Sequence, residues 1–118
     1  MPMNMLNSIR TAYEAGDTAK QDYIEAIHAR HASLFDYPEF IAGTDVESLR
    51  ILPEGIFVRS RSQQIELFLD PQDQHLVPCP LMNFRAYETI ETEFLKAITQ
   101  ENGVILDIGA NCGWYALA

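Results

Sequence analysis

The sequence predicts an α/β protein, in which an accessory region of helices and short antiparallel strands precedes the beginning of a Rossmann-like fold. Three observations support this prediction. Apolar residues recur at helical spacing in the first third of the chain, turn-forming residues recur at strand-length intervals in the middle, and an apolar run followed by two glycines ends the chain. The last pattern is typical of the strand, loop and helix unit at which parallel sheets bind nucleotides.

Two amphipathic helices are predicted before residue 40. Residues 6–13 place leucine, isoleucine and tyrosine at helical spacing, and Gly16 is a suitable stop. Residues 18–35 begin with a capping-box pattern and continue as a longer apolar stripe. We expect the second helix to end near Pro38, because proline disfavours a helical residue before it.

Neither the histidines nor the cysteines have the spacing of a metal site. His28 and His31 share a face of the predicted second helix, but the sequence around them is not H-E-x-x-H, which favours a position at the edge of a packing surface. Cys79 and Cys112 lie far apart in the sequence, and neither belongs to a C-x-x-C pair. We therefore expect no bound metal and two reduced thiols.

The middle of the chain is predicted to form a small antiparallel meander. Glycine, proline and polar clusters separate three stretches rich in branched and aromatic residues, at 48–52, 56–60 and 65–69. The last two are expected to form a hairpin that turns at residues 61–64. Alternation places Phe68 on the opposite side of its strand from the neighbouring leucines, so Phe68 is expected to need cover from another part of the protein.

A connector and a third helix are predicted to follow the meander. Residues 75–82 contain two prolines, which exclude a central strand and favour an extended connector. Residues 87–98 have helical spacing, and an Asn-Gly pair closes this third helix. The chain is thereby divided into an N-terminal accessory region, residues 1–82, and the beginning of a cofactor-binding domain, residues 83–118.

The last stretch of the chain contains the candidate site. Residues 104–108 have the composition of a strand that is buried on both faces of a parallel sheet, and Asp107 lies near its C-terminal end, where open α/β sheets bind ligands. Gly109 permits a sharp turn and close approach of a ligand, and Gly113 permits close packing of the following helix. Asn111 tolerates a left-handed backbone and offers both amide donors and an acceptor.

Two common phosphate-binding motifs do not fit this loop. A dinucleotide fingerprint, G-x-G-x-x-G, requires glycine at the position of Asn111. A P-loop requires lysine and a hydroxyl residue after its last glycine, and Trp114 follows Gly113 instead.

The string from Asp107 to Gly113, with Gly109, Ala110 and Asn111 between them, resembles motif I of the class I S-adenosylmethionine-dependent methyltransferases. It is more narrowly similar to the FkbM family, whose motif is D-x-G-A-N-x-G followed by an aromatic residue. The resemblance implies a Rossmann-like class I methyltransferase fold with S-adenosylmethionine as cofactor. It also implies that these five residues line the part of the pocket that holds the methionine end of the cofactor.

A second, looser resemblance lies ahead of this motif. Tyr87 and Glu88, followed by Glu91, look like a Y-E-x-x-E element that such proteins carry before motif I. The resemblance implies that Tyr87 or Glu91 lines the cofactor pocket. The alternative is a solvated acidic helix face with Tyr87 in the core, and the pattern alone does not separate the two.

The family resemblance implies methyl transfer, most simply O-methylation of a small molecule or a sugar hydroxyl, with no catalytic base that can be assigned. Two other interpretations stay open: a fragment of a nucleotide-binding Rossmann-type oxidoreductase, and a non-enzymatic interaction module left by truncation. Each further strand-helix-strand step needs about 30 residues. We therefore expect the 118 residues to be an N-terminal fragment that is inactive alone.

Composition and charge exclude several classes of partner. Seventeen acidic residues against eight basic ones give a formal net charge of -9, which is unsuited to a nucleic-acid surface. The sequence contains neither a secretory signal nor an apolar stretch of membrane-spanning length, so we expect a cytoplasmic protein without a membrane partner. The oligomeric state does not follow from the sequence.

Overall fold

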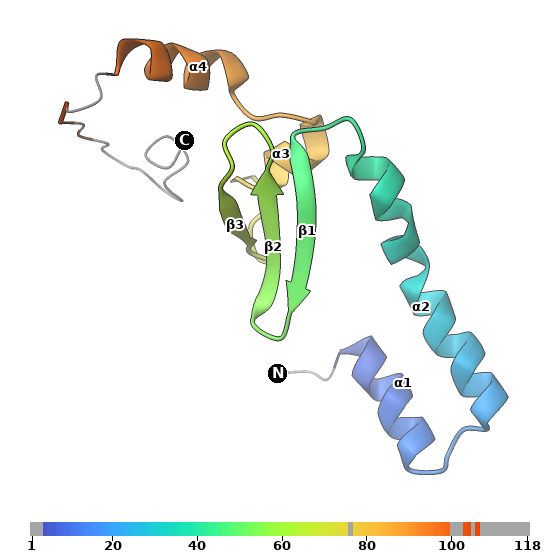
Figure 1. Cartoon of the computed structure of the whole chain (residues 1–118). Helices are drawn as coiled ribbons and strands as arrows, with labels where there is room; N and C mark the ends of the chain where they lie inside the picture. Colours follow the sequence, from blue (N-terminus) through green and yellow to red (C-terminus); the bar gives the residue numbers. More distant parts are fainter. Residues whose placement is uncertain (1–3, 76, 100–102, 105, 107–118) are drawn as a thin grey trace. The chain divides into compact units, whose positions relative to one another are not determined.

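The computed structural model describes residues 4–75, 77–99, 103–104 and 106, and the chain divides into two compact units, Met1–Phe40 and Ile41–Ala118 (Figure 1). The described elements are α1 (Met5–Glu14), α2 (Lys20–Ile41), β1 (Val46–Leu52), β2 (Gly55–Ser60), β3 (Glu66–Leu69), α3 (Cys79–Phe84) and α4 (Thr89–Ile98).

The first unit is a helical hairpin. Its first helix, α1, is capped by Asn4, whose side chain accepts a hydrogen bond from the backbone amide of Asn7 at 2.8 Å. It ends before Gly16, which has φ +82°, a left-handed conformation that glycine adopts without steric cost. The rings of Tyr13 and Tyr23 stack across the turn, with centroids 4.4 Å apart. The predicted first helix and its glycine stop are therefore confirmed.

The second helix is longer than predicted. It continues through Pro38 to Ile41, so the expected end near Pro38 is wrong. Proline removes its own amide donor and crowds the carbonyl four residues before it, but the amides of the residues after it can still complete a last turn. The helix is closed by Thr44, whose amide and hydroxyl both donate to the carbonyl of Ile41, at 3.1 and 2.7 Å.

The second unit is built on a three-stranded antiparallel sheet in the order β1-β2-β3. The predicted meander is confirmed, including the hairpin between β2 and β3. Val58 on the central strand is paired with Leu49 on one side and with Leu67 on the other, so apolar side chains line one face. The register shifts between Val46 and Ser48, which bends the start of β1.

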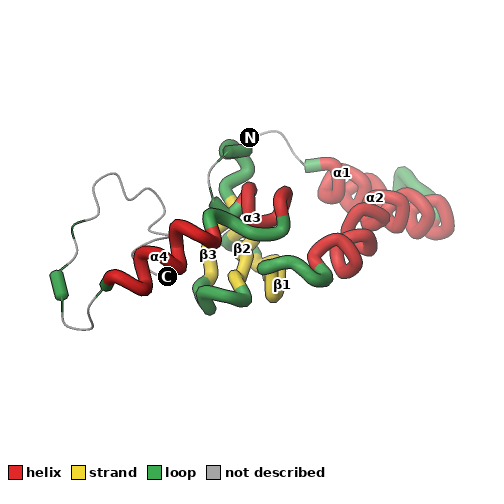
Figure 2. Tube along the Cα trace, turned by 90° about the horizontal axis from the view of Figure 1, so that it is seen from above, coloured by secondary structure: helices red, strands yellow, loops and turns green. Residues whose placement is uncertain are grey.

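The short helix α3 covers this apolar face (Figure 2). An extended connector was expected in this segment, and that expectation is wrong. Pro80 lies in the first turn of α3, where a missing backbone amide breaks no helical hydrogen bond. The sheet and α3 share one core, whose buried members are Val46, Val58, Leu67, Val77 and Leu81.

The opposite face of the sheet carries a pair of aromatic rings. Phe57 and Phe68 meet edge to face with centroids 5.8 Å apart, and Phe68 stays exposed. A Cβ on Gly55 would lie 2.5 Å from the Phe68 ring, so glycine is what allows the ring to lie on this strand. The guanidinium of Arg50 lies 5.7 Å from the Phe57 centroid and forms an ion pair with Glu66. Phe68 therefore obtains its cover partly from its own sheet.

The predicted third helix is confirmed as α4. Beyond it, Val104 and Leu106 belong to no strand and are 100% and 84% exposed. The other residues of the strand predicted at 104–108 lie outside the described part of the chain. The Rossmann-like fold and the boundary between residues 82 and 83 therefore stay predictions. Within the second unit, residues on both sides of that boundary contribute to one core, Leu81 before it and Tyr87 after it.

Candidate functional site

Most of the predicted cofactor site lies outside the described residues. This applies to Asp107, Gly109, Ala110, Asn111 and Gly113, whose assignment therefore rests on the sequence. Two members of the predicted site, Tyr87 and Glu91, belong to the described structure.

Tyr87 and Glu91 have different surroundings. Tyr87 is half-buried and packs against the core of the second unit, so part of its ring has a structural role. Glu91 is exposed in the first turn of α4, and Lys96 stands in the last turn, an arrangement that complements the helix dipole. These positions agree with a solvated acidic helix face and equally leave the Glu91 carboxylate accessible to a ligand.

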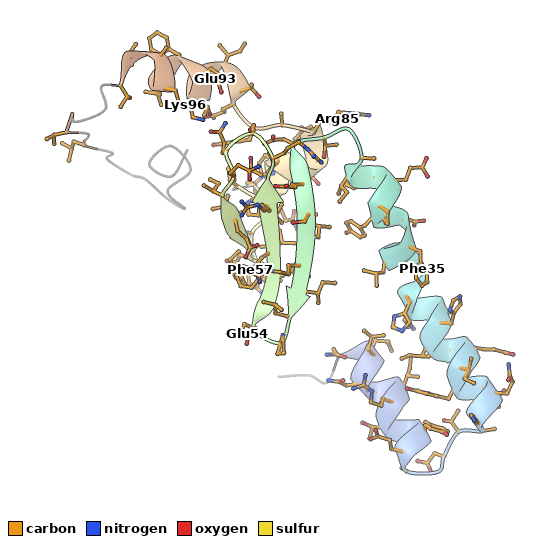
Figure 3. All side chains as sticks on the ribbon, in the orientation of Figure 1. Phe35, Glu54, Phe57, Arg85, Glu93 and Lys96 are labelled. Atoms are coloured by element: carbon orange, nitrogen blue, oxygen red, sulfur yellow. The ribbon has the colours of Figure 1, made fainter. Side chains whose placement is uncertain are left out.

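The connector that carries Tyr87 has an unusual backbone and is fixed at both ends. Arg85 and Glu88 have φ +75° and +37°, a region that side chains other than glycine seldom occupy. The Arg85 carbonyl accepts the Asp45 amide at 2.7 Å, near the start of β1 (Figure 3). The Glu88 carbonyl accepts the amide and the hydroxyl of Thr92 at 2.9 and 2.8 Å. Backbone strain of this kind is concentrated at functional sites, and here it flanks Tyr87.

Asp45 forms a polar hub that the sequence interpretation missed. Its carboxylate accepts hydrogen bonds from the hydroxyl of Ser60 at 2.6 Å and from the amide and hydroxyl of Ser62 at 2.7 and 3.0 Å. Its backbone carbonyl accepts the amide of Arg61 at 2.7 Å. The hub joins the start of β1 to the turn after β2. A Ser-x-Ser string after a strand is a signal for it, but its partner is evident only from the strand register.

The chemistry of this hub is structural. A serine becomes a nucleophile when an adjacent base, most often imidazole, takes its proton. Ser60 instead donates to a carboxylate that already accepts two bonds from Ser62, and Ser60 Oγ itself accepts the amide of Gln63 at 3.2 Å. The four groups hold the hairpin turn closed.

Cys79 is not placed to act as a nucleophile. Burial raises the pKa of its thiol, and the negative charges of Asp73 and Asp70 raise the pKa further. The thiol donates to the Asp73 carbonyl at 3.0 Å. The reactive thiolate is therefore scarce at neutral pH. Across the described ranges, no three His, Cys, Asp or Glu side chains are grouped so that they could hold a metal ion.

No protein-family model, curated protein or solved structure matches this chain. In the part of the chain that the structure describes, none of the helices has both the length and the apolar character needed to cross a membrane.

Proposed function

We propose that this chain carries the beginning of an S-adenosylmethionine-dependent methyltransferase domain of the FkbM type, which methylates a hydroxyl of a small molecule or sugar. The observation that carries the proposal is the string from Asp107 to Gly113, followed by the aromatic Trp114. An acid at the end of an apolar run, a loop bounded by two glycines and an asparagine within it are the residue types that a pocket for the amino-acid end of this cofactor requires.

Two features of the described residues support the proposal. A helix, α4, ends at Ile98 shortly before the proposed cofactor strand, as the family resemblance leads one to expect. The strained connector at residues 85–88 fixes Tyr87, and Glu91 follows it with an exposed carboxylate. Tyr87 and Glu91 are the two residues that the looser resemblance assigns to the cofactor pocket.

The proposed roles follow from the residue types. The cofactor supplies an activated methyl group on a sulfonium, so the work of the protein is to position and desolvate the reacting groups. Gly109 and Gly113 leave room for close approach to the backbone, and the Asn111 side chain offers both donors and an acceptor. Asp107 accepts hydrogen bonds from the cofactor or from the amides of the loop. No residue is assigned as the base.

Binding of S-adenosylhomocysteine tests this proposal. We expect the natural polypeptide that contains this chain to bind it, and Asp107→Ala to weaken binding by about 10- to 100-fold, because a hydrogen bond to a charged group contributes about 1.5–3 kcal/mol. Isothermal titration calorimetry measures both affinities. Glu93→Ala, an exposed change on α4, is the matched control and should leave the affinity unchanged. Undiminished affinity of the Asp107 variant would refute the proposal.

The alternatives give different outcomes in the same experiment. Binding of NAD without S-adenosylhomocysteine would support an oxidoreductase. Binding of neither would support an interaction module, and reading the gene past codon 118 provides an independent check. Continuous coding with an acidic residue about 20 positions after the glycine loop favours a nucleotide-binding enzyme.

A further inference from the structure

In the helical hairpin of the first unit, none of the described residues, 4–40, is buried. Neither α1 nor α2 contains a buried residue. An isolated helix as short as the 10 residues of α1 is marginal in water, and most helical stability in proteins comes from burying an apolar face. Two helices that only touch each other along one line bury too little surface to offset the entropy of ordering them. The hairpin therefore requires another surface.

The two helices differ in length, and this leaves part of α2 uncovered. At 1.5 Å per residue, the 10 residues of α1 extend about 15 Å and the 22 residues of α2 about 33 Å. The stack of Tyr13 on Tyr23 fixes where they begin to run side by side, so α1 accompanies roughly the first half of α2 (Figure 1). Phe35 lies beyond that half (Figure 3).

A second apolar stripe lies beside the line of contact. Ile24, His28 and Phe35 are separated by four and seven residues and so share one face of α2, next to the half-buried face that carries Tyr23 and Ile27. The His28 and Phe35 rings lie 5.8 Å apart, which is consistent with that shared face. The hairpin exposes large apolar side chains to 41–61% of their area, and we call the following five the hairpin patch: Met5, Leu6, Ile24, Leu34 and Phe35.

We infer that the hairpin patch binds a second copy of this chain, with the two hairpins forming an antiparallel four-helix bundle. Two helical hairpins that associate through their apolar faces make the closed four-helix arrangement, and two-fold homodimers are the commonest oligomers. A two-fold axis along the bundle places α1 of one copy against α2 of the other. Near the hairpin turns every helix then has antiparallel neighbours, and beyond the end of α1 the distal half of α2 faces the distal half of the partner subunit's α2 across the axis.

Charged side chains of opposite sign at the edge of the hairpin patch favour a second copy of the chain as its partner. Helical spacing places Arg10 beside the patch on α1, and Glu25 beside it on α2. Arg10 lies three residues before Tyr13 in α1, and Glu25 lies two residues after Tyr23 in α2. Because the two tyrosine rings stack on each other, Arg10 and Glu25 lie at a similar height along the hairpin. The two-fold arrangement therefore brings Arg10 toward Glu25 of the partner subunit, and this pair occurs twice.

The size of the patch sets the expected strength of the dimer. Half-exposed apolar side chains of this size each present on the order of 80–100 Å². Two patches then bury about 900 Å² of apolar surface, near the lower end of specific interfaces once a polar rim is added. We therefore expect a reversible dimer with a dissociation constant in roughly the micromolar range.

Sedimentation equilibrium of the whole chain tests this inference. The wild type is expected to pass from monomer to dimer between about 1 and 300 µM, and Phe35→Glu to weaken the dimer at least about tenfold. Ser33→Glu is the matched control, because Ser33 is exposed on the face of α2 opposite Ile24 and Phe35, and it should leave the dimer intact. A wild type that stays monomeric throughout this range would overturn the inference and indicate that the patch is covered by another partner or by other residues of the same chain.

A charge exchange separates a dimer contact from a folding defect. Arg10→Glu and Glu25→Arg should each weaken the dimer several-fold, and the double variant should recover most of the loss, because the exchanged pair attracts again across the interface. Helix content measured by circular dichroism at a protein concentration that saturates the dimer should be the same in all four proteins. Weakening without recovery in the double variant, at unchanged helix content, would contradict the proposed arrangement.

Discussion

At the scale of single residues, Asp45 joins distant segments of the described chain through a set of hydrogen bonds. Its carboxylate and backbone together bind the turn after β2, and its amide donates to the connector at Arg85. Ser60, one of its partners, is fully buried, so loss of the carboxylate would remove an acceptor from a group that water cannot reach. Asp45 thereby couples the sheet to the segment that carries Tyr87.

Replacing Asp45 should destabilise the second unit without affecting the first. We expect Asp45→Ala to lower the free energy of unfolding by about 2–3 kcal/mol, because several hydrogen bonds to a charged acceptor are lost together. Asp45→Asn keeps one oxygen acceptor and should cost less. Glu54→Ala, at the exposed turn between β1 and β2, is the control and should change stability by less than about 0.5 kcal/mol. Urea unfolding followed by strand-specific amide signals measures these differences, and equal effects of Asp45→Ala and Glu54→Ala would contradict the role of the hub.

At the scale of elements, the short helix α3 shows how a sheet of three strands obtains a core. One face of the meander is apolar, and in water such a face needs a cover. Leu81 supplies it from α3 and is 0% exposed, whereas Phe84, three residues later, is 76% exposed. The proline-rich segment therefore belongs to the fold of the sheet, although its composition is that of a connector.

The difference between these two side chains of α3 gives a direct test. Leu81→Ala should destabilise the second unit by about 2–5 kcal/mol, because it leaves a cavity in the shared core. Phe84→Ala removes a larger side chain from the same helix and should cost less than about 0.5 kcal/mol. Denaturant midpoints of the two variants check the ranking. If Phe84→Ala were the more damaging change, Phe84 would have to be covered by a surface outside the described residues.

At the scale of the whole molecule, the two compact units obtain their stability in different ways. The unit from Ile41 onward has a buried core of its own, whereas the described residues of the unit that ends at Phe40 form two helices and include no buried side chain. If the hairpin patch is covered by a second copy, the stability of the first unit should depend on protein concentration, and the stability of the second unit should not.

Hydrogen exchange at two protein concentrations tests this contrast. Amides of α1 and α2 should be better protected at the higher concentration, since dimerisation suppresses local opening, while amides of β2 should exchange at a constant rate. In Phe35→Glu the concentration dependence should disappear from the helices. Uniform protection of both units at every concentration would show that the hairpin is stabilised within a single chain.

The sequence predicted most of the described helices and strands because these elements are encoded locally. Glycine stops, helical spacing and strand-length intervals between turns depend on residues that are close in the chain, and they located α1, the three strands and α4. The errors occurred where one local rule competed with another. Pro38 predicts a helix end, but the helix completes one more turn after it despite the lost amide and the crowded carbonyl. Pro80 predicts an extended chain, but the first turn of a helix accepts proline.

The candidate cofactor loop is a different case, because its residues lie outside the described structure and their assignment depends on the order of residue types alone. For most of the other described residues, the sequence by itself determined where helices, strands and turns form, and the exceptions are the end of α2 and the helix α3. Only the tertiary structure decided that Asp45 meets Ser60, that Leu81 is buried while Phe84 is not, and that the Phe68 ring rests on Gly55. Such contacts join residues far apart in the sequence, so they follow from strand register and packing, which no local pattern specifies.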